Sequence, residues 1–200
     1  MSKVALLRCT QDMSRFATAL DGRPGALLAL DVGQRKVGIA ISDIYRIVAF
    51  PLGTLLRQER PDHQRPCTLT HQLITTIAKY QAIAVVAGYP LELSKAREGA
   101  ACSMVRTFLA SLCVIPDQME SVCPNLTPPL PCLLWDERFS SSFARMYQFI
   151  DDPRRRGRTK RLPQWKKRGI DAYAALIILR RVLGYDWARY QTSPERARGS

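Results

Sequence analysis

Three short apolar segments follow one another near the start of the chain. Residues 26–30 form an apolar run that ends at Asp31, and residues 36–42 alternate small or apolar side chains with other residues. Residues 46–50 form a third apolar stretch. Short segments of this kind, with a glycine between the first two, are typical of adjacent β-strands joined by turns. We therefore predict a meander of three strands, followed by a polar, proline-containing loop at 57–67.

The next apolar segments alternate between helical and strand spacing. Apolar side chains repeat at helical spacing over 69–80 and again over 104–112, which predicts two amphipathic helices. Between them, residues 82–87 form an uninterrupted run of small and β-branched residues, which predicts a buried strand with parallel neighbours. A short strand at 132–135 and a helix at 140–150 are expected to follow.

Two polar segments and one apolar helix are expected in the rest of the chain. Residues 114–131 contain five prolines and are expected to be an irregular insertion. Residues 154–168 contain nine basic side chains and no acidic one, and this like charge, with a glycine and a proline, predicts a loop. Residues 170–183 are apolar on nearly all sides, which predicts a buried helix.

The order of these elements predicts the fold class. A meander of strands followed by alternating helices and strands predicts an α/β fold with a mixed β-sheet flanked by helices. A chain of 200 residues has room for one such domain, which we expect to span residues 26–187. Residues 1–25 are expected to be a disordered leader or a targeting segment, and residues 188–200 a C-terminal tail.

The charge balance narrows the class of partner. Thirty Lys and Arg residues against seventeen Asp and Glu give a formal net charge of +13. Such an excess predicts a polyanionic partner, with nucleic acid favoured over an anionic membrane surface. A solvated basic surface, or ribosome association without chemistry, is the alternative. No apolar run reaches the roughly eighteen residues of a membrane span, so no membrane association is expected.

The cysteines predict the compartment. The chain has six cysteines without a CxxC pair and two histidines, and these cannot be combined into a zinc-binding spacing. We therefore expect reduced thiols in an intracellular protein. The cytoplasm is favoured, with the mitochondrion or plastid as the alternative if the basic first residues are a presequence.

Three acidic residues occupy positions suited to a catalytic carboxylate. Asp31 ends the first predicted strand, where ligands collect in open α/β sheets, although an aspartate before a glycine is more often a turn residue. Glu137 follows the strand at 132–135, where an acid can also favour the positive end of a helix. Asp171 lies on the apolar stripe of the last helix, where a carboxylate is costly unless it is paired or bound to a metal.

The chemistry of these three side chains predicts the kind of ion they would bind. Carboxylates without histidine or thiol partners suit hard cations such as Mg²⁺ or Mn²⁺. Two such ions activate water, clamp the scissile phosphate and stabilise the leaving oxygen. We therefore predict a two-metal nuclease site in which Asp31, Glu137 and Asp171 are both the metal ligands and the catalytic residues.

Basic residues near these acids are expected to hold the phosphate backbone. The basic loop at 154–168 lies just ahead of Asp171, and its side chains can neutralise phosphates without reading sequence. The predicted nucleic-acid-binding residues are Arg35, Lys36, Arg138, Arg154, Arg155, Arg156, Arg158, Lys160, Arg161, Lys166, Lys167 and Arg168.

Four segments of the chain together resemble a known family. LLALDVGQRKVGIAISD, VVAGYPL, LLWDERFSS and KKRGIDAYAALIIL are similar, in order and approximate spacing, to the YqgF/RuvX family of Holliday-junction-resolvase-like nucleases. The resemblance implies an RNase H-like fold and metal-dependent phosphodiester hydrolysis. It also implies a role in trimming the 5′ end of the small-subunit rRNA precursor within ribosome biogenesis. The family's catalytic acids fall on Asp31, Glu137 and Asp171, with Asp136 and Arg138 in supporting or substrate-contacting positions.

The chain departs from the family pattern at two places. It reads GYPL at 88–91 where the family commonly reads Gly-Leu-Pro-Leu followed by an Asn/Asp/Gly-rich turn. It has two serines at 140–141 where the family has two threonines. The first departure puts substrate contacts at that loop in question, and neither removes a carboxylate.

Other functions fit part of the pattern. The same site could resolve a four-way DNA junction, which would require a symmetric dimer, and the sequence does not report the oligomeric state. The domain could also be a non-catalytic rRNA-binding assembly factor, although a scaffold has no need of three acids where phosphates approach. A sugar-kinase or actin-like ATPase is set aside, because its two lobes need a longer chain.

Overall fold

The structure is a computed structural model, and it describes residues 3–57, 68–92, 97–114, 128–137 and 169–187. Several predicted features lie outside these residues: the helix at 140–150, the basic loop at 154–168, the C-terminal tail, and most of the loop at 57–67 and of the proline-rich insertion. Within the described part, no helix is long and apolar enough to cross a membrane.

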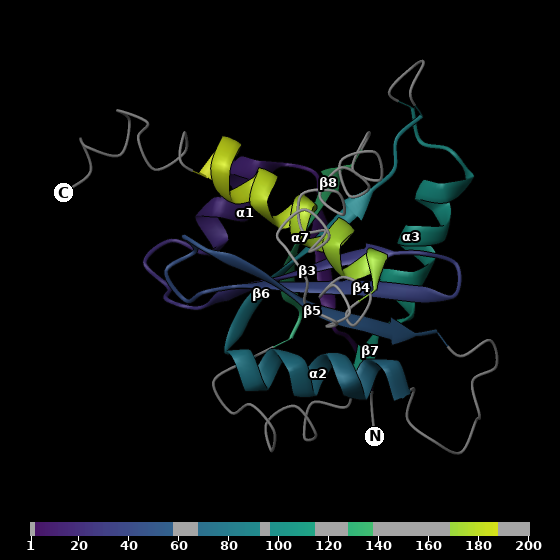
Figure 1. Cartoon of the computed structure of the whole chain (residues 1–200), viewed down its shortest axis with the longest axis horizontal. Helices are drawn as coiled ribbons and strands as arrows, with labels where there is room; N and C mark the ends of the chain where they lie inside the picture. Colours follow the sequence, from purple (N-terminus) through teal and green to yellow (C-terminus); the bar gives the residue numbers. More distant parts are fainter. Residues whose placement is uncertain (1–2, 58–67, 93–96, 115–127, 138–168, 188–200) are drawn as a thin grey trace, which may run out of the picture.

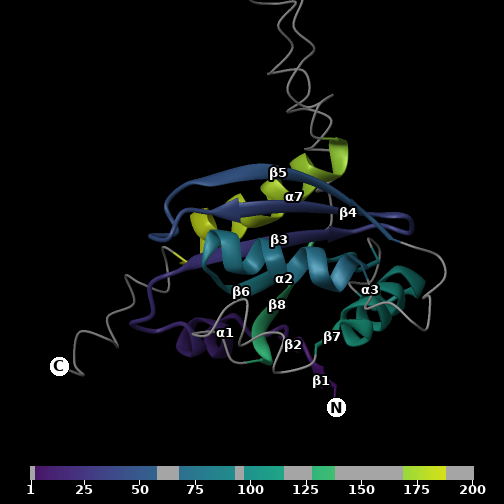
Figure 2. The ribbon, with the colours of Figure 1, turned by 90° about the horizontal axis from the view of Figure 1, so that it is seen from below.

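A six-stranded mixed sheet forms the centre of the molecule, in the order β2-β8-β6-β3-β4-β5 (Figures 1 and 2). The strands are β2 (Leu7–Thr10), β3 (Ala26–Val32), β4 (Lys36–Ser42), β5 (Ala49–Leu56), β6 (Ala82–Tyr89) and β8 (Leu130–Asp136). The meander β3-β4-β5 is antiparallel, whereas β6 is parallel to both β3 and β8, and β2 is parallel to β8. The predicted α/β class with a mixed sheet is confirmed.

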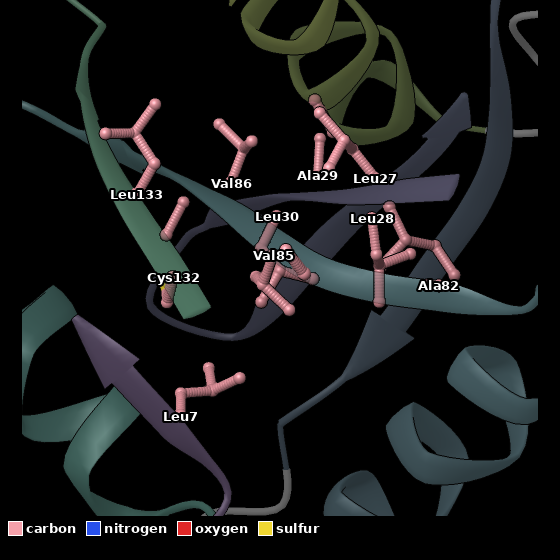
Figure 3. Packing of buried hydrophobic residues seen from close by; sticks show 14 of the residues in the cluster. Leu7, Leu27, Leu28, Ala29, Leu30, Ala82, Val85, Val86, Cys132 and Leu133 are labelled. Carbon is pink, nitrogen blue, oxygen red and sulfur yellow. The ribbon is translucent and has the colours of Figure 1, made fainter. Parts of the chain in front are cut away.

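Helices cover both faces of this sheet. Helix α7 (Ile170–Arg181) packs across β3, β4 and β5 on one face, and α2 (Thr68–Tyr80) lies on the other (Figures 1 and 3). Helix α3 (Ala100–Ser111) packs beside β6, and α1 (Met13–Ala19) beside β8. After α7 the chain continues as a π-helix, η2 (Val182–Trp187).

Apolar side chains of β3 point alternately to the two faces of the sheet, which explains why both faces are covered by helices. Leu27 and Ala29 point towards α7, whereas Leu28 and Leu30 point to the opposite face (Figure 3). All four are at most 1% exposed. Strands that are apolar on both faces are stable only between two layers of helices. Every residue from 172 to 179 of α7 is also buried, so the prediction of a buried helix is confirmed.

Several strand boundaries differ from the prediction, among them the start of β5 and the end of β6. β5 begins at Ala49 and not at residue 46, because Asp43 closes a turn: its Oδ1 accepts the amides of Ile47 (2.7 Å) and Val48 (2.8 Å). β6 continues through Gly88, where the prediction ended it, because that residue and the next pair with the end of β8.

The segment expected to be a leader contributes to the fold. β1 (Val4–Ala5) pairs with β7 (Cys113–Val114), and β2 adds an edge strand beside β8 (Figure 2). Leu6 and Phe16 are each 1% exposed, and Asp12 caps α1 by accepting two backbone amides. The expectation of disorder is therefore wrong for residues 4–19, because their apolar side chains complete the core. The alternative of a targeting segment stays a prediction.

Candidate active site

Two of the predicted acids, Asp31 and Asp171, are brought close together at a glycine. Asp31 lies opposite Gly38 in the β3–β4 pair. Alternation along β3 puts Asp31 on the same face as Leu27 and Ala29, which point towards α7 (Figure 3). A Cβ built on Gly38 would lie 1.9 Å from the carbonyl oxygen of Asp171, in the first turn of α7. Only glycine allows the helix to approach this closely, and the approach places Asp171 beside Asp31.

A second glycine, Gly88, leaves space for the side chain of Glu137. The amide of Glu137 donates to the carbonyl oxygen of Tyr89 at 3.2 Å, which fixes the backbone just beyond the end of β8. A Cβ on Gly88 would lie 2.1 Å from Oε2 of Glu137 and 2.7 Å from Cδ1 of Ile178. The carboxylate of Glu137 thus occupies the space between β6 and α7 that a larger residue at 88 would fill.

The pKa values of Asp31 and Glu137 show that each of these two carboxyl groups lies near another acid. Burial, and then the charge of Asp171, raises the pKa of Asp31 to about 7. Burial, and then the charges of Asp31 and Asp136, raises the pKa of Glu137 to about 8. Each carboxylate therefore lies in a site of low polarity and within the field of a like charge, which is the arrangement that raises a carboxyl pKa.

Glu137 also carries a buried oxygen without a partner. Its Oε2 is buried and makes no hydrogen bond to any residue that the structure describes, and the same is true of Nε1 of Trp135, two residues earlier. A buried polar atom left unpaired costs free energy, and an unpaired carboxylate costs more. Among the described residues, no three His, Cys, Asp or Glu side chains are gathered closely enough to form a complete metal-binding group. The acids thus influence one another without converging on one point.

The donor set fits a hard divalent cation. Asp31, Glu137 and Asp171 supply carboxylate oxygens, with neither sulfur nor imidazole in the set. A cation placed here would satisfy the unpaired oxygen of Glu137 and offset the repulsion that raises both pKa values. These three residues would hold it, and the chemistry would be hydrolysis at phosphorus.

A basic rim lies at the same end of the sheet as Asp31. Arg35, in the turn between β3 and β4, and Lys36, the first residue of β4, were predicted to bind nucleic acid, and both are exposed. Arg57 was missed because it fell in a predicted loop. Its Nη1 donates to the carbonyl oxygen of Gly33 (2.7 Å), its amide donates to that of Arg35 (2.8 Å), and its guanidinium lies 4.8 Å from the ring centre of Phe108. Arg57 therefore fixes the turn that follows Asp31.

The other predicted nucleic-acid contacts, Arg138 and the nine basic residues of the 154–168 loop, lie outside the described residues.

A hydrogen-bonded network behind the site also escaped prediction. The hydroxyl of Tyr89 accepts from Nε of Arg106 at 2.6 Å, and the guanidinium lies 5.1 Å from the centre of the Tyr89 ring. Arg106 pairs with Glu98, and Gln11 donates to the same carboxylate at 3.2 Å. The network thus anchors the residue whose carbonyl oxygen holds Glu137, through partners that sequence spacing does not connect.

The chain is similar to proteins of one known family. The family described as RuvX, Holliday junction resolvase, matches residues 25–185. A protein of Roseiflexus sp. (strain RS-1) named "Putative pre-16S rRNA nuclease" is 31% identical over 160 residues, which cover 80% of this chain and 94% of that protein. A protein of the same name from Rhodospirillum rubrum is 36% identical over 132 residues, or 65% of this chain and 68% of the relative.

One solved structure resembles the chain at a lower level. The RuvC protein of T. thermophilus, in complex with a Holliday junction substrate, shares 12% sequence identity and a TM-score of 0.41, over 80% of this chain and 96% of that one. A likeness of this size has no bearing on the function of the chain.

Proposed function

Because the chain belongs to the RuvX family of Holliday junction resolvases, we propose that it is a Mg²⁺- or Mn²⁺-dependent nuclease that hydrolyses phosphodiester bonds in structured RNA. The substrate we favour is the 5′ end of the small-subunit rRNA precursor, since relatives that are 31% and 36% identical to the chain are named for pre-16S rRNA. The observation that carries the proposal is the buried Oε2 of Glu137, which has no hydrogen-bond partner among the described residues and lies near the charge of Asp31.

The residues of the site divide the work between them. Asp31, Glu137 and Asp171 would hold the cations, which would supply the activation of water and the stabilisation of the leaving oxygen. Near neutral pH, the raised pKa values leave Asp31 and Glu137 partly protonated without a cation. The two side chains therefore release protons as they bind metal, which makes metal affinity rise with pH.

The basic residues serve the substrate. Arg35 and Lys36 lie beside the turn that follows Asp31, where they can neutralise phosphates on either side of the scissile bond. Arg138 and the 154–168 loop are proposed to extend this surface. An excess of positive charge over the whole chain draws a polyanion towards an acidic site that would otherwise repel it.

Two other functions share parts of this surface. A DNA-junction resolvase would use the same acids on a different substrate, and the name of the family supports it as the second candidate. A non-catalytic rRNA-binding assembly factor would need the basic surface alone. The buried Oε2 of Glu137, which has no partner in the described part of the chain, counts against the second alternative, because a scaffold gains nothing from it. Action on pre-rRNA would place the protein where ribosomes are assembled: the cytoplasm, or a mitochondrion or plastid.

A cleavage assay with three substrates tests the proposal. Purified full-length protein with Mn²⁺ is offered a pre-rRNA leader, a single-stranded RNA and a four-way DNA junction. We expect cleavage of the leader, loss of cleavage in Asp31→Asn with binding retained, and full activity in the control Asp21→Asn, which alters an exposed aspartate. Preferred cleavage of the junction would favour the resolvase. Full activity of Asp31→Asn would refute the site.

A further inference from the structure

The edge of the sheet formed by the N-terminal segment carries two cysteines side by side. Cys9 on β2 is the register partner of Cys132 on β8 in a parallel pair. Partners in neighbouring strands point to the same face of a sheet, and adjacent strands lie about 4.8 Å apart. This spacing falls within the range of roughly 4.4–6.8 Å between the Cα atoms of disulfide-bonded cysteines. The backbone of the two strands therefore already holds Cys9 and Cys132 at bonding range.

The two thiols differ in accessibility. β2 is an edge strand and Cys9 is exposed, whereas Cys132 is 0% exposed. Both are free thiols. A reagent from solution can therefore reach Cys9 directly, and it can reach Cys132 only through Cys9.

They also differ in reactivity. A hydrogen bond from the Cys132 thiol, and the nearby charge of Arg106, lower the pKa of Cys9 below its ordinary value. The same hydrogen bond, together with burial, raises the pKa of Cys132 well above it. The thiolate is the nucleophile in disulfide exchange. Cys9 is therefore the attacking thiol, and Cys132 is the resolving thiol.

The other described cysteines lack this arrangement. Cys102 is buried and donates to the carbonyl oxygen of Pro90 at 3.2 Å, and Cys113 lies 3.8 Å from that of Ala110. Cys9 also lies ahead of residues 25–185, which match the family. The pair therefore belongs to the extra edge strand of this chain and goes beyond the nuclease site.

We propose that Cys9 and Cys132 form a reversible redox modification site for low-molecular-weight disulfides such as glutathione disulfide. The Cys9 thiolate attacks one sulfur of glutathione disulfide, which forms a mixed disulfide and releases one glutathione thiolate. That thiolate takes the proton of Cys132, and the Cys132 sulfur attacks the Cys9 sulfur, so that the second glutathione leaves. Two protein thiols are oxidised to one disulfide, and glutathione disulfide is reduced to two glutathione molecules.

The Cys9–Cys132 disulfide would join the N-terminal segment to β8, the strand that leads to Glu137. Cys132 lies on β8, which ends at Asp136, directly before Glu137. The new bond would hold β2 against β8 and prevent the edge strand from separating. An exposed disulfide between adjacent strands is open to reduction, so a dithiol would restore both thiols.

Mass spectrometry of the full-length chain tests the pair. To leave Cys9, Cys102 and Cys132 as the remaining cysteines, Cys67, Cys113 and Cys123 are changed to Ser. The protein is incubated with glutathione disulfide, and its intact mass and linked peptides are measured. We expect the loss of two hydrogens, a peptide linking Cys9 to Cys132, and full reversal by dithiothreitol.

Two variants in the same background separate the roles of the thiols. Cys132→Ala should stop at a stable mixed disulfide carrying one glutathione, and Cys9→Ser should not react while its far-ultraviolet circular dichroism is unchanged. Reaction of Cys9→Ser at the parent rate would overturn the proposal. So would a parent protein that retains glutathione and forms no internal disulfide. The measurement does not involve nuclease activity, so the site in the β2–β8 pair and the proposed function stand or fall separately.

Discussion

The carboxylate of Glu137 lies where a side chain on Gly88 would be, since a Cβ at that glycine would come within 2.1 Å of Oε2. Strand β6 thereby creates the space that the site needs, although Gly88 itself carries no chemistry. The absence of a side chain at this position is therefore as important for the proposed activity as the acid it accommodates.

Gly88→Ala tests this relationship. The added methyl group would displace the Glu137 carboxylate, and a displacement of about 1 Å at a catalytic group lowers the rate by roughly 100-fold. We expect kcat to fall by about that factor with nucleic-acid affinity unchanged, measured by single-turnover cleavage and by filter binding. Gly53→Ala is the matched control, because a Cβ there meets nothing within 4 Å. Equal losses in both variants would contradict the role of Gly88.

Gly38→Ala should instead act through the packing of α7. A Cβ at this position would collide with backbone atoms of Asp171, which cannot rotate away. We expect a loss of about 2 kcal/mol in the free energy of unfolding, or a melting temperature lower by about 5 °C. Differential scanning calorimetry of the variant and of Gly53→Ala gives the comparison. An unchanged melting temperature would mean that α7 can sit further from the sheet.

The pH dependence of stability should reveal the two raised pKa values. Between about pH 4 and pH 8, the unfolded chain releases the protons of Asp31 and Glu137 while the folded chain retains them, since their folded-state pKa values are about 7 and about 8. The unfolded state then binds fewer protons, so stability falls as pH rises through this window. We expect a loss of several kcal/mol for the metal-free protein, since each unit of difference in pKa corresponds to about 1.4 kcal/mol.

Urea midpoints at pH 5 and pH 8 in the presence of EDTA measure this loss. The stability of the double variant Asp31→Asn/Glu137→Gln should be nearly the same at pH 5 and pH 8. Asp21→Asn should lose as much stability as the parent. A double variant that loses as much stability as the parent would show that other groups are responsible.

Tyr89→Phe tests the network behind Glu137. It removes the hydroxyl that accepts from Arg106 and leaves the ion pair of Arg106 with Glu98 in place. We expect a cost of about 1 kcal/mol and a several-fold fall in kcat at unchanged KM, because the carbonyl partner of Glu137 becomes less fixed. Tyr45→Phe, at a side chain that is 73% exposed, is the control. A change in KM alone would indicate a substrate contact and not a positioning role.

The basic rim predicts a change in salt dependence. Replacing both Arg35 and Lys36 with Gln removes two phosphate contacts, so the slope of log K against log salt concentration should fall by about 1.4–1.8. Binding titrations between low and moderate salt measure the slope. A control double variant at Arg15 and Lys79, on α1 and α2, should leave it unchanged. An unaltered slope in the first variant would place the substrate elsewhere.

Local patterns were enough to predict the centre of the fold. The apolar runs of β3 and β6 and the apolar surface of α7 can only be buried, so their class and place follow from the sequence. The start of β5 could not be predicted, because it depends on Asp43 capturing two amides that lie four and five residues away. The folding of the N-terminal segment could not be predicted either, because Leu6 and Phe16 are buried in a core that residues far along the chain complete.

The three acids and their grouping in one site could be predicted from the sequence, but the close contacts that position them could not. Asp31, Glu137 and Asp171 each had a sequence signal, whereas the glycines that let them meet have partners far away in sequence. Gly38 approaches Asp171, and Gly88 approaches Glu137. Such contacts arise only when strands and helix are packed, and sequence spacing does not report them. Arg57 was missed for the same reason, since its partners Gly33 and Phe108 are joined to it only by the fold.

Glu137→Gln is the most direct test of the central claim that these carboxylates form a metal-dependent nuclease site. The cleavage rate on a pre-rRNA leader would be measured against Mn²⁺ concentration for the parent, for Glu137→Gln and for Glu92→Gln, which alters an exposed glutamate. We predict Mn²⁺-dependent cleavage by the parent and by Glu92→Gln, and no cleavage by Glu137→Gln at any Mn²⁺ concentration with substrate affinity retained. Cleavage by Glu137→Gln at the parent rate and Mn²⁺ dependence would contradict the account.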